Sequence, residues 1–268
     1  MLITVALSIL TSIFISFPQT EIRLEQELNY KADFFIFDQL GYLYLINGTE
    51  LQKIDLKTKK EKSFSNLLAG NIYSVDVSDP FKTLIFYKDF NKLDWLDKNF
   101  GAIASTISLD DLGFNYVASV CQSVNGGFWL FDQSLFQIVY LDKNLKTTHK
   151  STQFSEMIDQ NTELDQVYML EKNDYIYLGI NGNSILIFDS YGTYIKTYPI
   201  NYNRDFQVNN ETIVYYEDQK LKFYNTTNYS EEQILLPDKK IRQVRLENKK
   251  IFMLTTEKLL IYQPDIFK

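Results

Sequence analysis

One short pattern recurs along this chain and limits what it can fold into. Ser184 to Gly192 reads SILIFDSYG, an apolar run closed by an aspartate and a turn that ends in glycine. Weaker copies occur along the rest of the 268 residues, and the intervals between their final polar residues are 42, 45, 47, 36 and 38. These final residues are Asp55, Asp97, Asp142, Asp189, Asn225 and Gln263. Self-similarity at such a period is typical of repeat architectures, in which each repeat is one small structural unit.

Two more series run in step with the first. About twenty residues before each final polar residue, a polar residue precedes an apolar one; these polar residues are Asp33, Ser74, Ser119, Gln166, Gln207 and Gln243. Between the two series lie segments rich in Tyr and Phe, at residues 42–46, 83–87, 127–131, 175–179, 212–216 and 251–255. A more polar segment follows the first five turns. Each unit therefore contains four short strands, and their hydrophobicity falls toward the fourth.

Four strands repeated six times predict an all-β protein, a six-bladed β-propeller. The 19 Tyr and 20 Phe residues agree, since aromatic side chains suit half-buried pleated surfaces. The sixth unit ends at Lys268, just after its third strand. Residues 21–28 alternate as an outer strand should, so we expect this N-terminal strand to complete the last blade. Such a closure would remove the free sheet edges of an open array.

At the level of one repeat, the chain resembles a known group of proteins. The sequence SILIFDSYGTYIKTY, residues 184–198, is similar to repeats of the NHL and related six-bladed propeller families, whose third strand ends in an apolar-Asp-x-x-Gly turn. The resemblance extends over residues 21–268 as architecture. It implies a role as an interaction platform, because propellers of this kind in bacterial envelopes mostly act in that way.

The first residues predict export. Residues 1–17 carry no charged side chain and are mostly apolar, and the charged segment begins at Glu21. This pattern is typical of a secretory signal peptide over residues 1–20, with an uncleaved anchor or a buried segment as the alternatives. Residues 21–268 are then one propeller domain in the periplasm or at the cell surface, with no membrane span after cleavage. The only cysteine, Cys121, lies mid-chain, so a lipidated N-terminal cysteine is excluded.

Composition excludes several classes of function. The net charge of −7 and pI of about 4.9 leave no basic field for nucleic acid or an anionic membrane surface. One cysteine and one histidine, His149, rule out an internal disulfide framework and a Cys/His zinc set. We therefore predict no cofactor and no metal. The spacing Asp89-x-Asn91-x-x-Asp94 lacks the glycine and the closing glutamate of a calcium loop.

The polar members of the second series are the candidate site. In a propeller the innermost strands converge on a central channel, and Asp33, Ser74, Ser119, Gln166, Gln207 and Gln243 are predicted to line it. They could bind a small ligand or an ion, or they could simply face water in the channel. The Asp and Asn residues that end the third strands are expected to bond backbone amides in turns. His149 is expected to be exposed to solvent and Cys121 to be buried.

Two longer connections are the other candidates for binding. Residues 154–163 and 109–116 should lie on one face of the disc, where a rigid scaffold displays them. Tolerated loop length is the alternative explanation.

Together these patterns predict a non-catalytic, exported propeller that binds protein partners in an envelope assembly. A sharper form of this hypothesis is an accessory subunit docked on an outer-membrane secretion or transport machine. A hydrolase or lyase acting on saccharide or peptide at the channel is the alternative from another class. Its paired carboxylates would have to come from different blades, and no pair stands out in the sequence.

Overall fold

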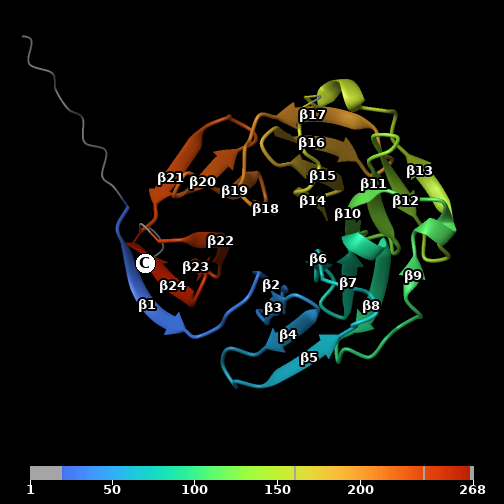
Figure 1. Cartoon of the computed structure of the whole chain (residues 1–268). Helices are drawn as coiled ribbons and strands as arrows, with labels where there is room; N and C mark the ends of the chain where they lie inside the picture. Colours follow the sequence, from blue (N-terminus) through green and yellow to red (C-terminus); the bar gives the residue numbers. More distant parts are fainter. Residues whose placement is uncertain (1–19, 160, 238, 266–268) are drawn as a thin grey trace, which may run out of the picture.

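Six four-stranded antiparallel sheets surround a central axis in a β-propeller, as Figure 1 shows. The computed structural model describes residues 20–159, 161–237 and 239–265. The predicted signal peptide falls almost entirely on residues outside this part. Among the described residues, no helix is long and apolar enough to cross a membrane.

Each blade is one consecutive set of strands, numbered here from the innermost strand outward. Blade 1 consists of β2 (Phe34–Phe37), β3 (Leu43–Asn47), β4 (Glu50–Ile54) and β5 (Glu61–Ser65). Blade 2 consists of β6 (Ser74–Asp76), β7 (Lys82–Tyr87), β8 (Lys92–Asp97) and β9 (Ile107–Ser108). Blade 3 consists of β10 (Val117–Gln122), β11 (Phe128–Asp132), β12 (Gln137–Leu141) and β13 (Thr147–Lys150).

The remaining blades follow the same plan. Blade 4 consists of β14 (Val167–Lys172), β15 (Tyr175–Ile180), β16 (Ser184–Asp189) and β17 (Tyr194–Tyr198). Blade 5 consists of β18 (Phe206–Asn209), β19 (Thr212–Glu217), β20 (Lys220–Asn225) and β21 (Glu231–Leu235). Blade 6 consists of β22 (Ile241–Glu247), β23 (Lys250–Thr255), β24 (Leu259–Pro264) and the N-terminal β1 (Ile22–Leu28).

The predicted closure is confirmed. Strand β1 pairs antiparallel with β24, from Ile22 opposite Pro264 to Leu28 opposite Leu259, so the two ends of the chain share one sheet. A register shift between Leu24 and Gln26 interrupts the ladder once. This pairing supplies the fourth strand that blade 6 lacks and covers the edge of β24, whose first four residues are buried.

Apolar packing between neighbouring blades forms the core. The buried hydrophobic residues fall into six clusters, and each lies between two adjacent blades; Trp129 and Phe188, for example, belong to the cluster between blades 3 and 4. The second strand of each blade is almost fully buried, whereas the outer strands β5 and β17 are mostly exposed. This gradient explains the fall in hydrophobicity within each repeat.

The polar residues that end the third strands act in turns, as predicted. Asp189 Oδ1 accepts the backbone N–H of Tyr191 at 2.9 Å and of Thr193 at 2.8 Å. Asp55, Asp97, Asp142 and Asn225 accept backbone N–H groups two residues further on in the same way. Gly192 has a φ of 84°, and a Cβ there would lie 3.1 Å from the Ser151 nitrogen, which explains why the best repeat carries glycine.

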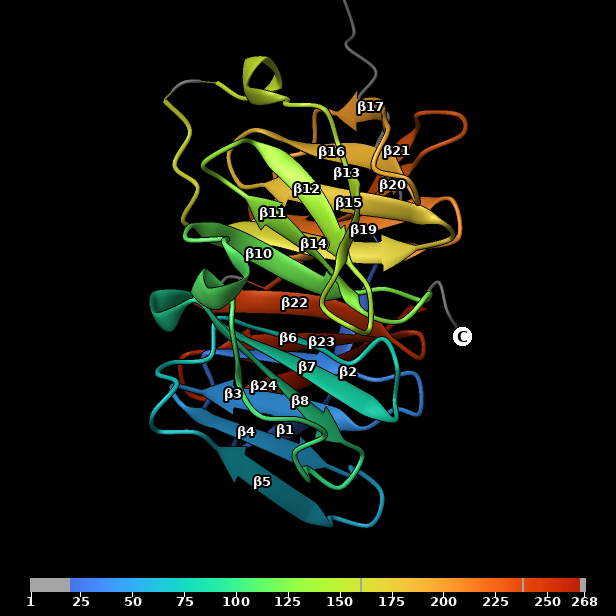
Figure 2. The same cartoon turned by 90° about the vertical axis from the view of Figure 1, so that its right-hand side faces the viewer.

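The two faces of the disc differ, as the edge-on view in Figure 2 shows. We call the loop face the side on which the chain passes from one blade to the next, and the hairpin face the opposite side. The 3-10 helices η1 (Lys88–Phe90), η2 (Asp110–Leu112) and η3 (Ser155–Met157) belong to connections of the loop face. Both of the longer connections singled out in the sequence, 109–116 and 154–163, therefore lie on this one face.

Closure by β1 can be tested with a truncation. A chain that starts at Asn29 lacks the ladder to β24, and we expect it to lose about 3–6 kcal/mol of stability, or roughly 10–15 °C in melting temperature. Exposure of the β24 edge should also promote association, measured by size-exclusion chromatography. A chain that starts at Thr20 is the matched control. Equal melting temperatures for the two chains would contradict a closing role for β1.

Candidate functional site

Two cavities lie along the propeller axis. The upper cavity, of about 230 Å³, opens on the loop face and is bordered by the starts of β2, β6 and β14 and by Arg204 and Asp205, just before β18. The lower cavity, of about 180 Å³, lies toward the hairpin face. Ile36, Ser74, Val75 and Tyr168 line both. The axis of the propeller is therefore hollow, as the convergence of six innermost strands predicts.

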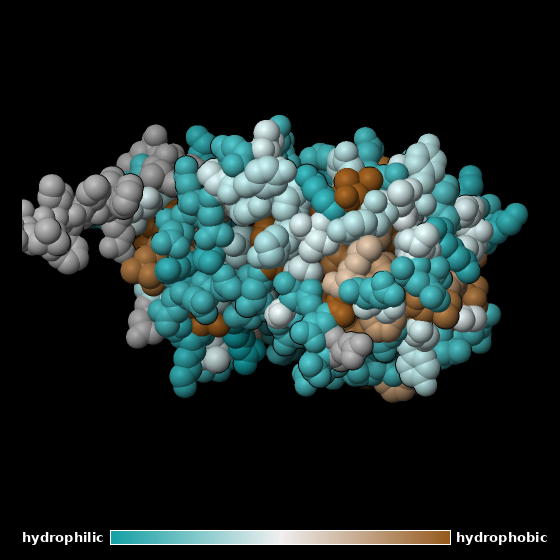
Figure 3. All heavy atoms as spheres, turned by 90° about the horizontal axis from the view of Figure 1, so that it is seen from above, coloured by the Kyte–Doolittle hydropathy of each residue, from teal (hydrophilic) through white to brown (hydrophobic). Residues whose placement is uncertain are grey.

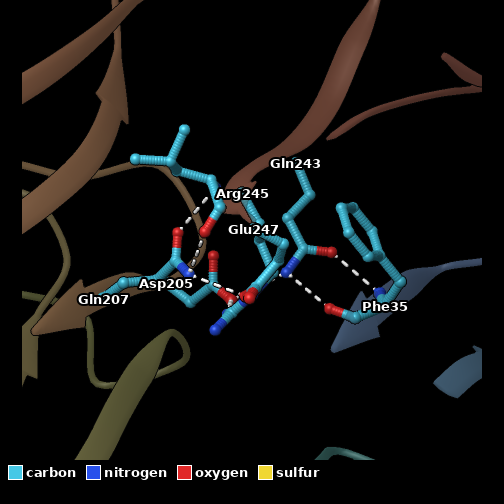
Figure 4. A network of polar contacts seen from close by, with 7 residues as sticks. Phe35, Asp205, Gln207, Gln243, Arg245 and Glu247 are labelled. Carbon is cyan, nitrogen blue, oxygen red and sulfur yellow. Dashed lines mark hydrogen bonds and ion pairs between the residues drawn. The ribbon is translucent and has the colours of Figure 1, made fainter. Parts of the chain in front are cut away.

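Glutamine side chains join neighbouring blades beside these cavities (Figure 4). The Gln243 amide accepts the Phe35 N–H at 2.8 Å and donates to the Phe35 carbonyl at 3.0 Å, linking blade 6 to blade 1. Gln207 does the same to Leu246, accepting its N–H at 2.8 Å and donating to its carbonyl at 3.0 Å, which links blade 5 to blade 6. We call each of these paired bonds a clasp.

A third clasp joins blade 3 to blade 2. Gln122 Nε2 donates to the Asp76 carbonyl at 2.6 Å, and the Asp76 carboxylate accepts the Gln122 N–H at 2.8 Å. Separate blades share no backbone ladder, so polar groups of the innermost strands would otherwise be buried without partners. The clasps satisfy these groups and fix the spacing of the blades.

The six predicted channel residues are not equivalent. Gln207 and Gln243 are clasps, and of these two Gln207 also borders the lower cavity. Ser74 lies between the two cavities, and Asp33 and Gln166 lie at the mouth of the upper one. Asp33 there accepts the Gly48 N–H, and Gln166 accepts a bond from Asn181.

Ser119 is sealed away from both cavities. Blades 2 and 4 meet above it, because the Tyr73 hydroxyl accepts the Val167 N–H at 3.0 Å and donates to the Asp165 carbonyl at 2.8 Å. Lys88 adds a bond of 2.9 Å to the Leu164 carbonyl. All six residues of β10 are consequently buried. The repeat pattern placed Ser119 correctly on an innermost strand, but it carried no information about this bridge.

A buried ion pair lies next to the clasps. Arg245 NH1 contacts Asp205 Oδ2 at 2.5 Å, and the same oxygen accepts a bond of 2.7 Å from Gln243. Burial alone would lower the pKa of Arg245, but the negative charge of Asp205 outweighs it, so the pKa is raised. Glu247 lies 3.7 Å from the Arg245 Nε, which has no hydrogen-bond partner among the described residues. Removing either partner of such a pair is costly, because the other charge stays buried.

Three carboxyl groups border the lower cavity. Burial raises the pKa of Asp76, Glu171 and Glu247 above their ordinary values, against the hydrogen bonds that favour the charged forms. Glu171 accepts a bond of 2.9 Å from the Trp129 indole and one from the Val124 N–H, so it also links blade 4 to blade 3. Within the described ranges, no group of three or more His, Cys, Asp or Glu residues could hold a metal ion.

Sequence reasoning missed Arg204 and Asp205, which belong to none of the three repeat series. Arg204 lies over the Phe34 ring, 4.0 Å from its centroid, so a residue from the approach to blade 5 reaches blade 1 across the mouth of the upper cavity. Two charged residues directly before an innermost strand were the available signal. No other blade has an arginine at this position.

The other single residues take structural positions. His149 is half-buried between the rings of Tyr140 and Tyr191, at 5.6 and 5.7 Å, and is not fully exposed as predicted. Cys121 is fully buried, and burial raises the pKa of its thiol well above the usual value. In the Asp89, Asn91 and Asp94 cluster, Asp94 accepts bonds from Tyr87, Thr106 and Asn66, so it serves packing.

Comparison with solved structures places the fold among known propellers. A streptogramin B lyase is similar over 91% of this chain and 98% of its own, with a TM-score of 0.62 and 14% identity. BamB from Moraxella catarrhalis matches 85% of this chain and 83% of its own, with a TM-score of 0.53 and 10% identity. No family model and no curated protein sequence matches. The six-bladed propeller is therefore shared at the level of fold.

A third similar structure comes from a larger protein. It is the extracellular domain of a putative hybrid two-component system from B. thetaiotaomicron, with a TM-score of 0.56 and 10% identity. The match covers 85% of this chain but only 33% of that one. At such identity the likeness concerns the fold alone.

The clasps predict a position-specific cost. Gln243→Leu leaves the buried N–H and carbonyl of Phe35 without partners, and we expect a loss of about 2–4 kcal/mol in the free energy of unfolding. Gln166→Leu is the matched control, since its amide is exposed and bonds only within blade 4; it should change stability by under about 0.5 kcal/mol. Urea unfolding measures both. Equal losses would show that the clasp does not hold the blades.

Stability should also depend on pH through Glu171. Its pKa is raised in the folded state, so between its ordinary value near 4.5 and the folded value the native protein binds more protons than the unfolded chain. Stability should therefore fall as pH rises through this window. Glu171→Gln removes this contribution, so the stability of wild type relative to the variant should decline from pH 4.5 upward. Urea unfolding at four pH values tests this, with the exposed Glu156→Gln as control; a constant difference would contradict it.

Proposed function

We propose that the chain is a non-catalytic protein-binding module that is exported and works in a cell-envelope assembly, with the loop face as its binding surface. The observation that carries this proposal is a set of large apolar side chains exposed on that face. We call them the apolar arc: Leu67, Leu68, Phe90, Tyr116, Leu135 and Met157. Leu68 is 87% exposed and Leu67 is 78% exposed, which is unusual for residues of this size.

The arc is continuous because successive loops of the face bond to one another. The Phe90 ring covers Gly70, where a Cβ would lie 2.5 Å from the ring, so Phe90 adjoins the loop that carries Leu67 and Leu68. The next residue, Asn91, accepts the Leu109 N–H at 2.9 Å and donates to Asp110.

The same series of bonds continues across blade 3. The Gln133 N–H donates to the Tyr116 carbonyl, and the Phe154 N–H donates to the Phe136 carbonyl. These contacts connect the loops that carry Tyr116, Leu135 and Met157. A rigid scaffold thus presents one apolar strip from blade 1 to blade 4 instead of isolated side chains.

Charge around the arc specifies the chemistry of a partner. Seven acidic residues of the same loops are exposed: Asp89, Asp110, Asp111, Glu156, Asp159, Glu163 and Asp165. The only Lys or Arg in these loops, Lys88, is bonded to the carbonyls of Leu164 and Asp165. An apolar protein surface rimmed by Lys and Arg fits this arrangement, since opposite charges steer encounter and exclude wrong partners.

Surface hydropathy supports the same side of the molecule. Figure 3 views the rim of the disc and shows hydrophobic atoms gathered toward its right-hand end, which holds the strands of blade 3. On the hairpin face the exposed apolar residues are spread over separate turns; Leu40, Phe81 and Val124, for example, belong to three blades. An interface is expected where apolar area is contiguous.

The envelope location rests on two supports. The uncharged apolar start of the chain favours export, and one of the similar structures is an extracellular domain. Within this proposal, docking on an outer-membrane secretion or transport machine is the more specific form. A propeller that presents one face to a larger assembly would serve it as a rigid spacer with a selective surface.

A lyase or hydrolase acting on saccharide or peptide at the channel is the second candidate function. It is favoured by the three buried carboxyl groups at the lower cavity, whose raised pKa values suit proton transfer, and by the likeness to a lyase. Turnover in a substrate screen that Glu171→Gln abolishes would support this function over display.

The arc is tested by paired triple variants. Leu67→Ser, Leu68→Ser and Tyr116→Ser together should leave stability within about 1 kcal/mol, because all three side chains are exposed. We expect them to abolish recovery of a partner that the wild type retains from detergent-solubilised envelopes, and to weaken binding of that purified partner at least about 100-fold.

The control carries equivalent changes on the hairpin face: Leu40→Ser, Phe81→Ser and Val124→Ser. It should retain the same partner at the same affinity as the wild type. Recovery of the wild-type chain alone, or equal binding by both triple variants, would refute the loop face as the binding surface.

A further inference from the structure

The upper cavity contains a cation that the protein does not neutralise. Arg204 is the only Lys or Arg residue that lines it. Among the described residues its guanidinium makes no hydrogen bond and no ion pair; its close contact is with the Phe34 ring, 4.0 Å from the centroid. Five N–H donors at the edge of a planar group are therefore unused where they border a cavity.

Both nearby carboxylates are already engaged by other residues. Asp205 bonds to Arg245 at 2.5 Å and to Gln243 at 2.7 Å. Asp33 accepts the Gly48 N–H at 2.8 Å and lies 3.5 Å from Arg242. The acidic groups around Arg204 lower the electrostatic cost of its charge, but they leave its donors without direct acceptors.

Stacking on Phe34 orients these donors. An aromatic ring covers one face of the guanidinium and holds it in place by a cation–π contact, while the N–H groups remain in the plane. Partial burial of Arg204 lowers its pKa from the ordinary value, and the Asp205 charge opposes this, so an incoming anion would meet a cation that water solvates poorly. Such a fork matches a carboxylate with two parallel hydrogen bonds.

The remaining wall specifies the rest of the ligand. Ile36, Ile72, Val75 and Val167 make one part of the cavity apolar, and the Ser74 hydroxyl and the Gln166 amide supply polar groups at its side and mouth. Its volume of about 230 Å³ lies just below the usual range of small-molecule sites, about 300–1,000 Å³. One free cation amid Asp33 and Asp205 suits a single negative charge better than a phosphate dianion.

The geometry points to a ligand site in the upper cavity for a small monocarboxylate with a branched apolar body, bound through Arg204. The carboxylate could belong to a free organic acid or to the C-terminus of a peptide, since both present the same group. This site does not depend on the apolar arc, because its ligand would be held inside the channel mouth by residues that the arc does not contain.

Ligand-observed NMR titration of the purified full chain tests the site with three probes. 4-Methylpentanoate represents a free acid, N-acetylleucine represents a peptide C-terminus, and N-acetylleucinamide is the neutral control. We expect at least one of the two acids to bind with a dissociation constant on the order of 1 mM, and the amide to bind at least about 10-fold more weakly. Binding of N-acetylleucine alone would identify a peptide terminus as the source, and binding of both acids would identify the shared group.

Variants assign the binding to Arg204. Arg204→Gln should weaken binding of the acid about 10- to 100-fold, and Arg204→Lys should weaken it less, because charge without the planar fork is retained. Lys172→Gln, which removes the same charge at the lower cavity, should bind as the wild type does. Circular dichroism and melting temperature show whether each variant is folded.

Three results would overturn the proposal: no binding of either acid, equal binding of the neutral amide, or unchanged binding by a folded Arg204→Gln. Failure of these titrations would leave the loop-face experiment unaffected, since that experiment reads out a protein partner. The two proposals can therefore fail separately.

Discussion

The propeller depends on how separate sheets are joined near its axis. Within a blade, backbone ladders satisfy nearly every polar group, but between blades no ladder exists. Apolar clusters fill the space between blades without specifying their register. Gln207 and Gln243 supply what is missing, because each amide bonds both the N–H and the carbonyl of one residue in the next innermost strand. Gln243 makes its clasp between the last and the first blade, where β1 also closes the outer edge.

The charges of the channel follow from these clasps. Asp205 accepts a bond from Gln243 and pairs with Arg245, so one carboxylate serves both the clasp and the buried cation. This occupancy leaves Arg204, the neighbour of Asp205 in sequence, without an acceptor among the described residues. The ligand site thus arises from the same interaction that stabilises the closure. Replacing Asp205 would disturb blade spacing and cavity charge together, which is why variants of Arg204 separate the two effects better.

The repeat, the four strands of each blade and the closing strand could be predicted from sequence, because each depends on periodic hydrophobicity and on turn residues such as Asp189. The series of polar residues also marked the innermost strands correctly. It could not tell whether a polar side chain would face the channel or a neighbouring backbone, since both directions are polar. Two glutamines at the same place in consecutive blades, Gln207 and Gln243, were the available hint of a clasp.

What remained hidden depends on contacts between blades that are distant in sequence. Ser119 is buried because Tyr73 and Lys88 of blade 2 reach the chain before blade 4, a contact across more than ninety positions for Tyr73. Arg204 occupies the mouth because Phe34 of blade 1 offers it a ring. Such contacts are made by the connections between blades, and these vary freely in length because no ladder constrains them. His149 likewise lies between two rings that only the fold brings together.

The same connections link the two proposed surfaces physically. The loop that exposes Leu67 and Leu68 continues directly into Ile72 and Tyr73, which line the upper cavity. Lys88, beside Phe90 of the arc, lies over the Tyr73 ring at 4.8 Å and bonds the chain that leads into blade 4. A partner that orders the first loop would therefore also order one wall of the cavity. Because coupling between two sites is reciprocal, a ligand that rigidifies Tyr73 would favour binding at the arc to the same extent.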